Sequence, residues 1–412
     1  MKKNPFISFI VCLFALILGV GGGAVGITYA TMPETEELVV GEEVYYTYNG
    51  TGVSNVPLDS AGQGLSVHFL ELGNKYTGDC TYIKYGDVDI LIDCGSKSSS
   101  ISTVSEYLKT YMGEDNKIDY CIVTHAHTDH YAGFATGTKV QGIYDLFDFG
   151  TIIDFGSATN KDKDSGMLKK YIDNRDDAIE RCDAEYFDVS VSALKGNNKI
   201  YNIGANNEVQ LEILYNRYYN QKINGTENNY SVCVMLKFDD KEFLFTGDLE
   251  EHGSSAETYL LEDNESLKDI ANSSDGVELY KAGHHGSSTS SSKNFIDAIK
   301  PEVVCVCCCA GSPEYTDDVD KMFPTTSFIE TIAPHTQDIF VTSLCVDWKN
   351  DEYTSMNGNI VVIAIAEQEK LGINCSNNDQ ILRKQEWFNR TITVDGIERA
   401  MRTWPPNGVV ID

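Results

Sequence analysis

Six consecutive residues hold three imidazoles and one carboxylate, and they constrain the fold of this chain more than any other feature. The segment from His125 to His130 reads HAHTDH and directly follows the apolar, strand-like run at residues 120–123. A strand that ends in such a cluster brings nitrogen and oxygen ligands to one point, as Zn²⁺ and Mn²⁺ require. Along an extended loop, His125 and His127 would face one metal ion, while Asp129 and His130 would face a second. A solvated polar loop is the alternative, but three of the chain's eight histidines lie here.

Two further strand-like runs end in residues that can complete a metal site. Residues 241–246 stop at a glycine followed by Asp248, and residues 277–282 stop at a glycine followed by His284 and His285. A glycine permits a tight turn where a ligand would have to point into a cleft. Asp248 could instead cap a helix, and the two histidines could lie in a surface turn. We expect these three residues to join the histidine-rich segment.

The order of these segments resembles the metallo-β-lactamase-fold hydrolases, and within them the soluble domain of ComEC-type DNA-uptake competence proteins. Three blocks carry the resemblance, Thr-His-Ala-His-Thr-Asp-His, Gly-Asp-Leu and Gly-His-His-Gly-Ser, after a hairpin-like segment at residues 65–92. It extends over roughly residues 64–366. A weaker resemblance, around residues 247–252, is to the choline-phosphate esterases of Gram-positive cell surfaces.

The fold that this resemblance implies is an α/β (α+β) sandwich of αββα type, with two mixed β-sheets flanked by helices. Apolar alternation and turn signals agree, because groups of strands are interleaved with helices. We expect strands near residues 65–72, 80–85, 88–93, 119–124, 208–214, 231–238, 242–246, 277–282, 302–309, 338–344 and 359–366. We expect helices near residues 101–112, 164–184, 255–271, 292–299 and 326–333.

The resemblance also implies two metal positions. The second position would take Asp129, His130, Asp248 and one of His284 or His285, with Asp248 bridging to the first position. Asp129 and Asp248 are therefore the residues that we expect to be catalytic.

The first position has fewer ligands in this sequence. Many family members supply a third histidine from between the histidine-rich loop and the Gly-Asp turn, and residues 131–247 contain none. His125, His127 and the bridging Asp248 would then be its only protein ligands. We expect one to two ions, Zn²⁺ or Mn²⁺, with one held more firmly than the other.

Three polar residues are candidates for substrate binding. Asn229 and Ser231 occupy a place where the competence-type sequences also carry polar residues, and Ser287 ends the Gly-His-His-Gly-Ser block. A loop that simply enters the strand at residues 232–238 would explain Asn229 and Ser231 equally well.

The amino-terminal segment predicts export. Lys2 and Lys3 precede an apolar stretch at residues 6–30, and acidic residues follow it. This charge order places the amino terminus in the cytoplasm and the body on the extracellular face of the membrane. The stretch is long enough to span a bilayer, and residues 28–30 also read as a signal-peptidase site, so that the protein is either anchored or secreted.

The chain divides into four expected parts. Residues 1–30 are a signal peptide or membrane anchor, residues 31–63 a stalk, residues 64–366 the hydrolase domain and residues 367–412 a C-terminal appendage. Four of the 12 cysteines lie between residues 305 and 309, in an apolar run, and we expect buried free thiols there. A disulfide, for example between Cys80 and Cys94, is the alternative to free thiols.

The formal net charge of −30 limits the classes of function. It repels nucleic acid except where metal charge is focused, so that it counts against a nonspecific nucleic-acid binder more than against a metal-dependent phosphodiesterase. We interpret the chain as an exported phosphodiesterase or nuclease of the ComEC type, in which metal-activated water attacks phosphorus.

The substrate stays open at this point. DNA is the substrate that the resemblance favours, and a choline-phosphate or other cell-wall ester is the alternative. A carbonyl hydrolase such as a lactamase and a non-catalytic surface-binding module are the competing classes, because a fold does not fix its function.

Overall fold

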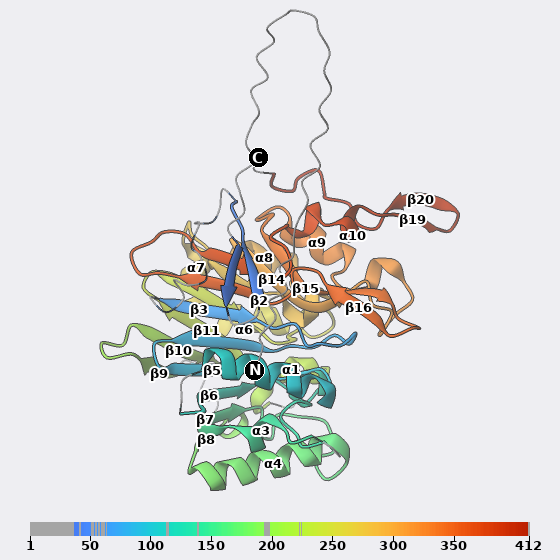
Figure 1. The fold of residues 1–412 in the computed structure, drawn as a ribbon. Coiled ribbons are helices and arrows are strands. Elements are labelled where there is room, and N and C mark those ends of the chain that lie inside the picture. The colour runs from blue at the N-terminus through green and yellow to red at the C-terminus, as the bar shows by residue number, and fades with distance from the viewer. Residues whose placement is uncertain are drawn as a thin grey trace, which may run out of the picture. The chain divides into compact units, whose positions relative to one another are not determined.

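Figure 1 shows the computed structural model of the chain. It describes residues 37–40, 43–50 and 64–410 apart from residues 113–114, 138–139, 193–197, 222 and 224, together with positions 53, 56, 58 and 62. The predicted export segment at residues 6–30 lies outside these described residues. Within them, no helix combines the length and the apolar character needed to cross a bilayer.

Sheet A contains ten strands, in the order β1-β2-β18-β17-β3-β4-β5-β6-β7-β8. The strands β5 to β8 run parallel to one another, whereas the other neighbours are antiparallel, so the sheet is mixed. The bounds are β1 (Glu37–Val40), β2 (Glu43–Thr47), β3 (Leu65–Phe69), β4 (Thr81–Tyr85), β5 (Val88–Ile92), β6 (Lys117–Val123), β7 (Asp148–Asp154), β8 (Glu185–Asp188), β17 (Ile360–Ala364) and β18 (Gly372–Cys375).

Sheet B contains eight strands, in the order β16-β15-β14-β13-β12-β11-β10-β9. The strands β12 to β15 are parallel and the remaining pairs are antiparallel, so this sheet is mixed too. The bounds are β9 (Lys199–Ile203), β10 (Val209–Leu214), β11 (Cys233–Phe238), β12 (Lys241–Phe245), β13 (Leu279–Lys281), β14 (Val303–Ala310), β15 (Ile339–Asp347) and β16 (Glu352–Ser355).

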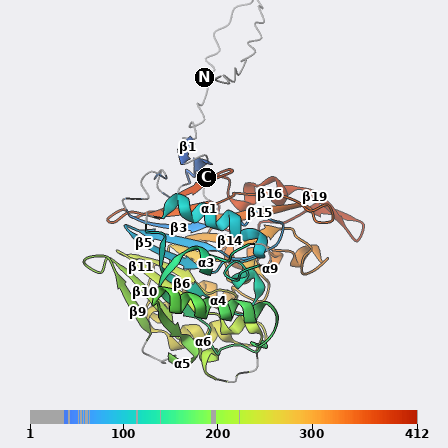
Figure 2. The ribbon, with the colours of Figure 1, turned by 60° about the horizontal axis from the view of Figure 1, so that its bottom comes forward.

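Helices connect the parallel strands. In sheet A, α1 follows β5 and α4 follows β7; in sheet B, α6 and α7 follow β12, α8 follows β13 and α9 follows β14. Several of these helices can be followed in Figure 2. The bounds are α1 (Ile101–Tyr111), α2 (Thr128–Tyr131), α3 (Ile143–Leu146), α4 (Gly166–Cys182), α5 (Val189–Ser192), α6 (Ala256–Asp263), α7 (Glu265–Asn272), α8 (Lys293–Ile299), α9 (Thr326–Ile332) and α10 (Glu386–Asn389).

The two sheets pack against each other through apolar side chains. Phe69 of β3 meets Phe245 of β12 with the ring centroids 6.4 Å apart, and Tyr85 of β4 meets Phe238 of β11 at 5.6 Å. All four side chains lie on strands that alternation predicted. The expected fold class, two mixed sheets with helices, is confirmed.

The structure differs from the expected boundaries at both ends of the domain. The strands β1 and β2 form within the expected stalk, and β18 forms within the expected appendage, where it pairs with both β2 and β17. The side chain of Tyr45 in β2 is fully buried, with its hydroxyl 3.4 Å from that of Tyr107. These strands of four or five residues lie near the edge of sheet A, which is why the sequence carried little signal for them.

The rest of the expected appendage contains α10 and a separate hairpin of β19 (Thr391–Val394) and β20 (Ile397–Ala400). This hairpin projects from the body in Figure 1. Trp387 and Phe388 of α10 are buried in the main core. Every cysteine that the structure describes is a free thiol, and those at positions 305 and 307–309 are buried in β14.

Candidate metal centre

The candidate metal centre forms where the carboxyl ends of parallel strands from both sheets meet. In sheet A, the loop after β6 carries His125 and His127, and the short helix α2 carries Asp129 and His130. Sheet B contributes the turn after β12 and the turn after β13. Clefts beside the carboxyl ends of strands are common ligand sites in α/β proteins, because loops from neighbouring strands converge there.

One oxygen of Asp248 is the meeting point of four imidazoles. Its Oδ2 lies 3.1 Å from His130 Nε2 and 3.4 Å from His285 Nε2. The Nε2 atoms of His284 and His125 lie 3.8 Å and 4.0 Å from the same oxygen. Asp248 is buried, as are all of these histidines except His284, which is partly exposed.

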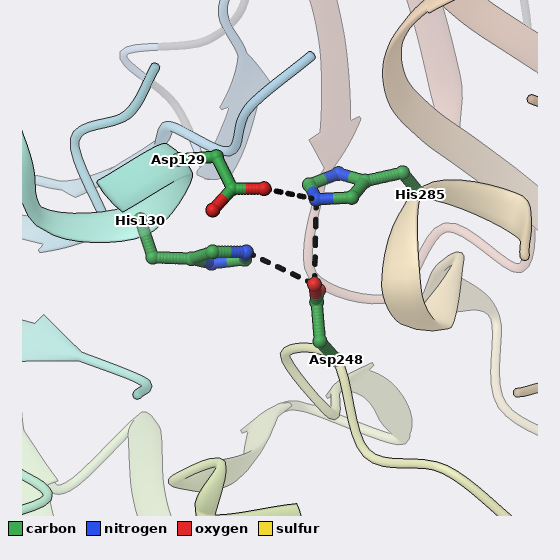
Figure 3. A group of neighbouring side chains, drawn as sticks. All are labelled: Asp129, His130, Asp248 and His285. Carbon is green, nitrogen blue, oxygen red and sulfur yellow. Dashed lines mark ion pairs between the residues drawn. The ribbon is translucent and has the colours of Figure 1, made fainter. Parts of the chain in front are cut away.

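Four ligand atoms form a tight group at the second position. They belong to Asp129, His130, Asp248 and His285, and all lie within 4.8 Å of one another. Figure 3 shows the four side chains pointing toward one another from α2 and from the two turns of sheet B. His285 Nε2 lies 3.5 Å from Asp129 Oδ2. Of the two adjacent histidines, the structure therefore places His285 in this group.

His125 and His127 are the residues that the sequence predicts for the first position, and they lie in contact with each other. His125 Nε2 lies 3.0 Å from His127 Nδ1, and the two rings meet nearly edge to face. On its other side the His125 ring is fixed through Nδ1, which lies 3.1 Å from the hydroxyl of Thr124 and 3.4 Å from that of Ser231. Burial lowers the pKa of His125 well below its usual value, so this imidazole is neutral and able to bind a cation.

The three expected substrate-binding residues lie near the centre, but each has a partner within the protein. The hydroxyl of Ser231 accepts a hydrogen bond from the backbone N–H of Asp248 at 3.0 Å. The side-chain oxygen of Asn229 accepts one from the backbone of Glu250 at 3.1 Å, and the Ser287 hydroxyl lies 3.0 Å from that of Thr289. In this structure these groups shape the turns around the centre, and their contact with substrate stays a prediction.

Several residues of the site were not found from the sequence. Asp93, after β5, accepts from the backbone and the hydroxyl of Thr124, each at 2.7 Å, and lies 2.8 Å from His130 Nδ1. Asp79, before β4, lies 3.1 Å from His285 Nδ1 and forms an ion pair with buried Lys281. Like Asp248, Asp93 follows a strand-like run and lies close to a glycine, here Gly95. The same sequence pattern could therefore have identified Asp93. Asp79 and Lys281 carry no comparable signal.

The centre contains more carboxylates than buried ammonium groups, and a bound cation would balance this excess of negative charge. Asp79, Asp93, Asp129 and Asp248 bring four carboxylates together, whereas Lys281 is the one buried ammonium among the described residues that contacts them. Burial by itself would raise the pKa of Asp248, but the neighbouring imidazoles hold it well below its usual value. A divalent ion would balance the excess of negative charge without requiring protonated histidines.

A second observation also fits a metal ion: several buried polar atoms of the centre lack a hydrogen bond to any described residue. His130 Nε2, His285 Nε2 and Asp248 Oδ1 are buried and make no hydrogen bond within the described part of the chain. Each such atom left without a partner costs about 1–3 kcal/mol. Imidazole nitrogens and carboxylate oxygens are the ligands of Zn²⁺ and suit Mn²⁺ as well. The cluster thus has the chemistry of a metal site, and it does not distinguish between these ions.

Comparison with known proteins supports the same fold. A family model described as the metallo-β-lactamase superfamily matches residues 73–143, the segment that contains the histidine-rich loop. No curated protein matches the chain in sequence.

Solved structures give low similarity scores. The metallo-β-lactamase-fold protein YhfI from Bacillus subtilis is 10% identical with a TM-score of 0.38, and the match covers 68% of this chain and 96% of that one. CmlA, a diiron β-hydroxylase from Streptomyces venezuelae, is 12% identical with a TM-score of 0.36, over 70% and 53%. A metallo-β-lactamase from Cronobacter sakazakii is 15% identical with a TM-score of 0.29, over 52% and 73%. The two mixed sheets with their helices, together with the family match at the histidine-rich loop, give this chain the metallo-β-lactamase fold.

Proposed function

We propose that this protein is a metal-dependent hydrolase that cleaves phosphodiesters. The observation that carries the proposal is the convergence of four imidazoles on one buried carboxylate oxygen. Among the described residues, the Nε2 atoms of His130 and His285 make no hydrogen bond. Asp129, His130, Asp248 and His285 would hold one ion. When bound, a divalent ion supplies a Lewis acid and nucleophilic water at neutral pH.

The residues at the mouth of the centre support a phosphoryl substrate. The hydroxyl of Tyr315, a residue that is 57% exposed, donates a hydrogen bond to Asp129 Oδ2 at 3.0 Å. Lys97, which is 43% exposed, lies with its amine 4.0 Å from Glu314. The Phe323 ring packs against Tyr315 at 5.6 Å. Substrate oxygens that displaced Asp129 as the acceptor of the Tyr315 hydroxyl would gain a hydrogen-bond donor of the kind suited to a phosphodiester.

DNA is the substrate that we place first, because of the resemblance of the sequence blocks to the ComEC-type domain. The second candidate is a choline-phosphate or other cell-wall ester, and the observation that favours it is the net charge of −30, which repels a polyanion. The amino-terminal stretch at residues 6–30 supports export, with the hydrolase on the extracellular face of the membrane or secreted.

The test compares four substrates side by side. We would reconstitute the purified protein with Mn²⁺ or Zn²⁺ and offer it linear DNA, bis-p-nitrophenyl phosphate, p-nitrophenyl phosphorylcholine and a cephalosporin. We expect turnover of the phosphodiesters that is lost on chelation. Turnover of the cephalosporin alone would contradict the phosphodiesterase, and metal binding without any turnover would favour the surface-binding module.

The location has its own test. We expect protease added to intact spheroplasts to degrade the domain, because the charges around residues 6–30 orient it outward. Full protection of the domain, with a cytoplasmic control protein also protected, would overturn the proposed location.

A further inference from the structure

The two adjacent histidines after β13 are held in the same way, although only one of them belongs to the tight group of the second position. His285 Nδ1 lies 2.9 Å from the backbone oxygen of Cys307, and His284 Nδ1 lies 3.1 Å from Glu250 Oε1. An acceptor at Nδ1 fixes the tautomer and leaves the Nε2 lone pair for a metal. In both residues Nε2 faces Asp248.

The backbone explains how consecutive side chains reach the same carboxylate. In an extended strand, neighbouring side chains point to opposite sides. His284 and His285 both adopt left-handed conformations, with φ 44°, ψ 51° and φ 55°, ψ 22°. Such conformations are uncommon for residues other than glycine, and they persist where the surrounding structure enforces them, often at functional sites. Here they turn both imidazoles toward Asp248.

Glu250 is built to hold His284. Its side chain is buried, and it accepts hydrogen bonds from the hydroxyls of Thr226 and Thr289. A second polar group, the side-chain amide of Asn228, lies 3.5 Å from His284 Nδ1. The imidazole is thus anchored by a carboxylate in the manner of a metal ligand.

We propose that His284 is the third nitrogen ligand of the first metal position, together with His125, His127 and the shared carboxylate of Asp248. Glu250 is then the positioning residue for His284. The consecutive histidines divide between the two positions, His284 at the first and His285 at the second. This ligand takes the place of the histidine that residues 131–247 do not supply. Three nitrogens and one oxygen make up a ligand set of the kind that zinc accepts, and with this set the proposed centre holds two ions.

The inference rests on the proposed metal centre, and its test counts metal ions rather than turnover. Elemental analysis and chelator competition would be applied to the full chain, loaded with Zn²⁺, and to the variants His284→Ala, His127→Ala, Glu250→Gln and His252→Ala. His252 is the matched control, because it is an exposed histidine in the neighbouring loop.

We expect two ions in the parent protein and in His252→Ala, and one ion in His284→Ala and His127→Ala. The double variant His127→Ala/His284→Ala should still keep one ion, because both changes remove the same position. Glu250→Gln should keep two ions and bind the weaker one about 10- to 100-fold less tightly, as for other residues that orient a metal-bound histidine.

Three results would overturn the inference. They are a parent protein that binds a single ion, a His284→Ala variant that keeps two ions with unchanged affinity, and a double variant that loses both. Far-ultraviolet circular dichroism checks that His284→Ala is folded; if it is not, the conservative Glu250→Gln variant decides by the affinity of its weaker ion. A parent protein that binds no metal would instead remove the proposed function itself.

Discussion

Asp248 differs from every other residue of the centre because one of its oxygens faces the Nε2 atoms of four of the five histidines. In the proposed centre, a histidine such as His127 belongs to a single position, so we expect its loss to leave the other position intact. Removing the carboxylate disturbs both positions and also leaves Lys281, 4.0 Å away, with less negative charge nearby. Residues that are shared between two ions are therefore expected to be the most sensitive to substitution.

We predict that Asp248→Ala lowers phosphodiesterase turnover more than either His125→Ala or His127→Ala, by more than about 100-fold. Asp129→Ala and His130→Ala should follow, since they belong to the second position. Turnover and bound metal would be measured in parallel for each variant. If the changes at His125 and His127 were the most damaging while those at Asp129 and His130 left activity intact, the working ion would be at the first position.

Residue types and spacing at strand ends were enough to single out the histidine-rich loop, Asp248 and the histidine pair. They were not enough to choose between His284 and His285, because that depends on left-handed backbone conformations that the sequence does not encode visibly. Asp79 and Lys281 were not identified as site residues for another reason. They are one acidic and one basic residue among many, and only the packing of the two sheets makes them partners.

At the scale of elements, the sequence predicted most of the long apolar strands. It missed the short strands near the sheet edges, and it also missed β7, a seven-residue strand that lies between β6 and β8 in sheet A. β14 and β15 are buried along most of their length and were expected with nearly the observed bounds. The helix expected at residues 255–271 is divided into α6 and α7 at Asn264, whose side-chain amide donates to the backbone oxygens of Leu260 and Tyr215. Helical periodicity continues across this break, so pattern alone could not reveal it.

The ion pair of Lys281 and Asp79 links β13 of sheet B to the loop before β4 of sheet A. We predict that Lys281→Met alone lowers the free energy of unfolding by about 3 kcal/mol, because it leaves a buried carboxylate without its cation. The double variant Lys281→Met/Asp79→Asn should recover most of this loss. Urea unfolding in the presence of chelator measures both, and a double variant as unstable as the single one would contradict the pairing.

Glu257 joins α6 to the start of α8, where it accepts hydrogen bonds from the backbone N–H groups of Ser291 and Ser292. Burial raises the pKa of Glu257 to about 7, against an ordinary value of 4.5, although these hydrogen bonds oppose the shift. Below pH 4.5 the group is protonated in both the folded and the unfolded chain. As pH rises from 4.5 to 7, only the unfolded chain ionises, so folding loses stability over this window.

The expected loss is about 3 kcal/mol by pH 7 and stays constant above it. The glutamine in Glu257→Gln cannot ionise, so this variant does not lose stability in this way. Between pH 4.5 and pH 7, its free energy of unfolding should therefore rise by about 3 kcal/mol relative to that of the parent. Chemical unfolding at several pH values measures the difference, in which titrations common to both proteins cancel. A difference that does not change with pH would contradict the prediction.

At the scale of the whole molecule, the excess of 62 acidic over 32 basic residues sets how a charged substrate approaches. A protein that binds nucleic acid through basic residues loses affinity as salt rises, because counterions compete for the phosphates. This protein should show the opposite trend with DNA, since salt screens the repulsion between two negatively charged partners. A zwitterionic phosphodiester carries no net charge, so the field of the whole protein should act on it only weakly.

We therefore predict that the KM for linear DNA falls as NaCl is raised from about 10 mM to about 150 mM, a range in which the Debye length shrinks from about 30 Å to about 8 Å. Over the same range the KM for p-nitrophenyl phosphorylcholine should stay nearly constant, which makes it the control for effects of salt on the metal centre. Steady-state kinetics with both substrates on one metal-loaded preparation gives the comparison. A KM for DNA that rises with salt would mean that a local basic surface outweighs the net charge during binding. Equal salt responses of the two substrates would instead place the effect in the catalytic centre and would contradict repulsion of DNA by the net charge.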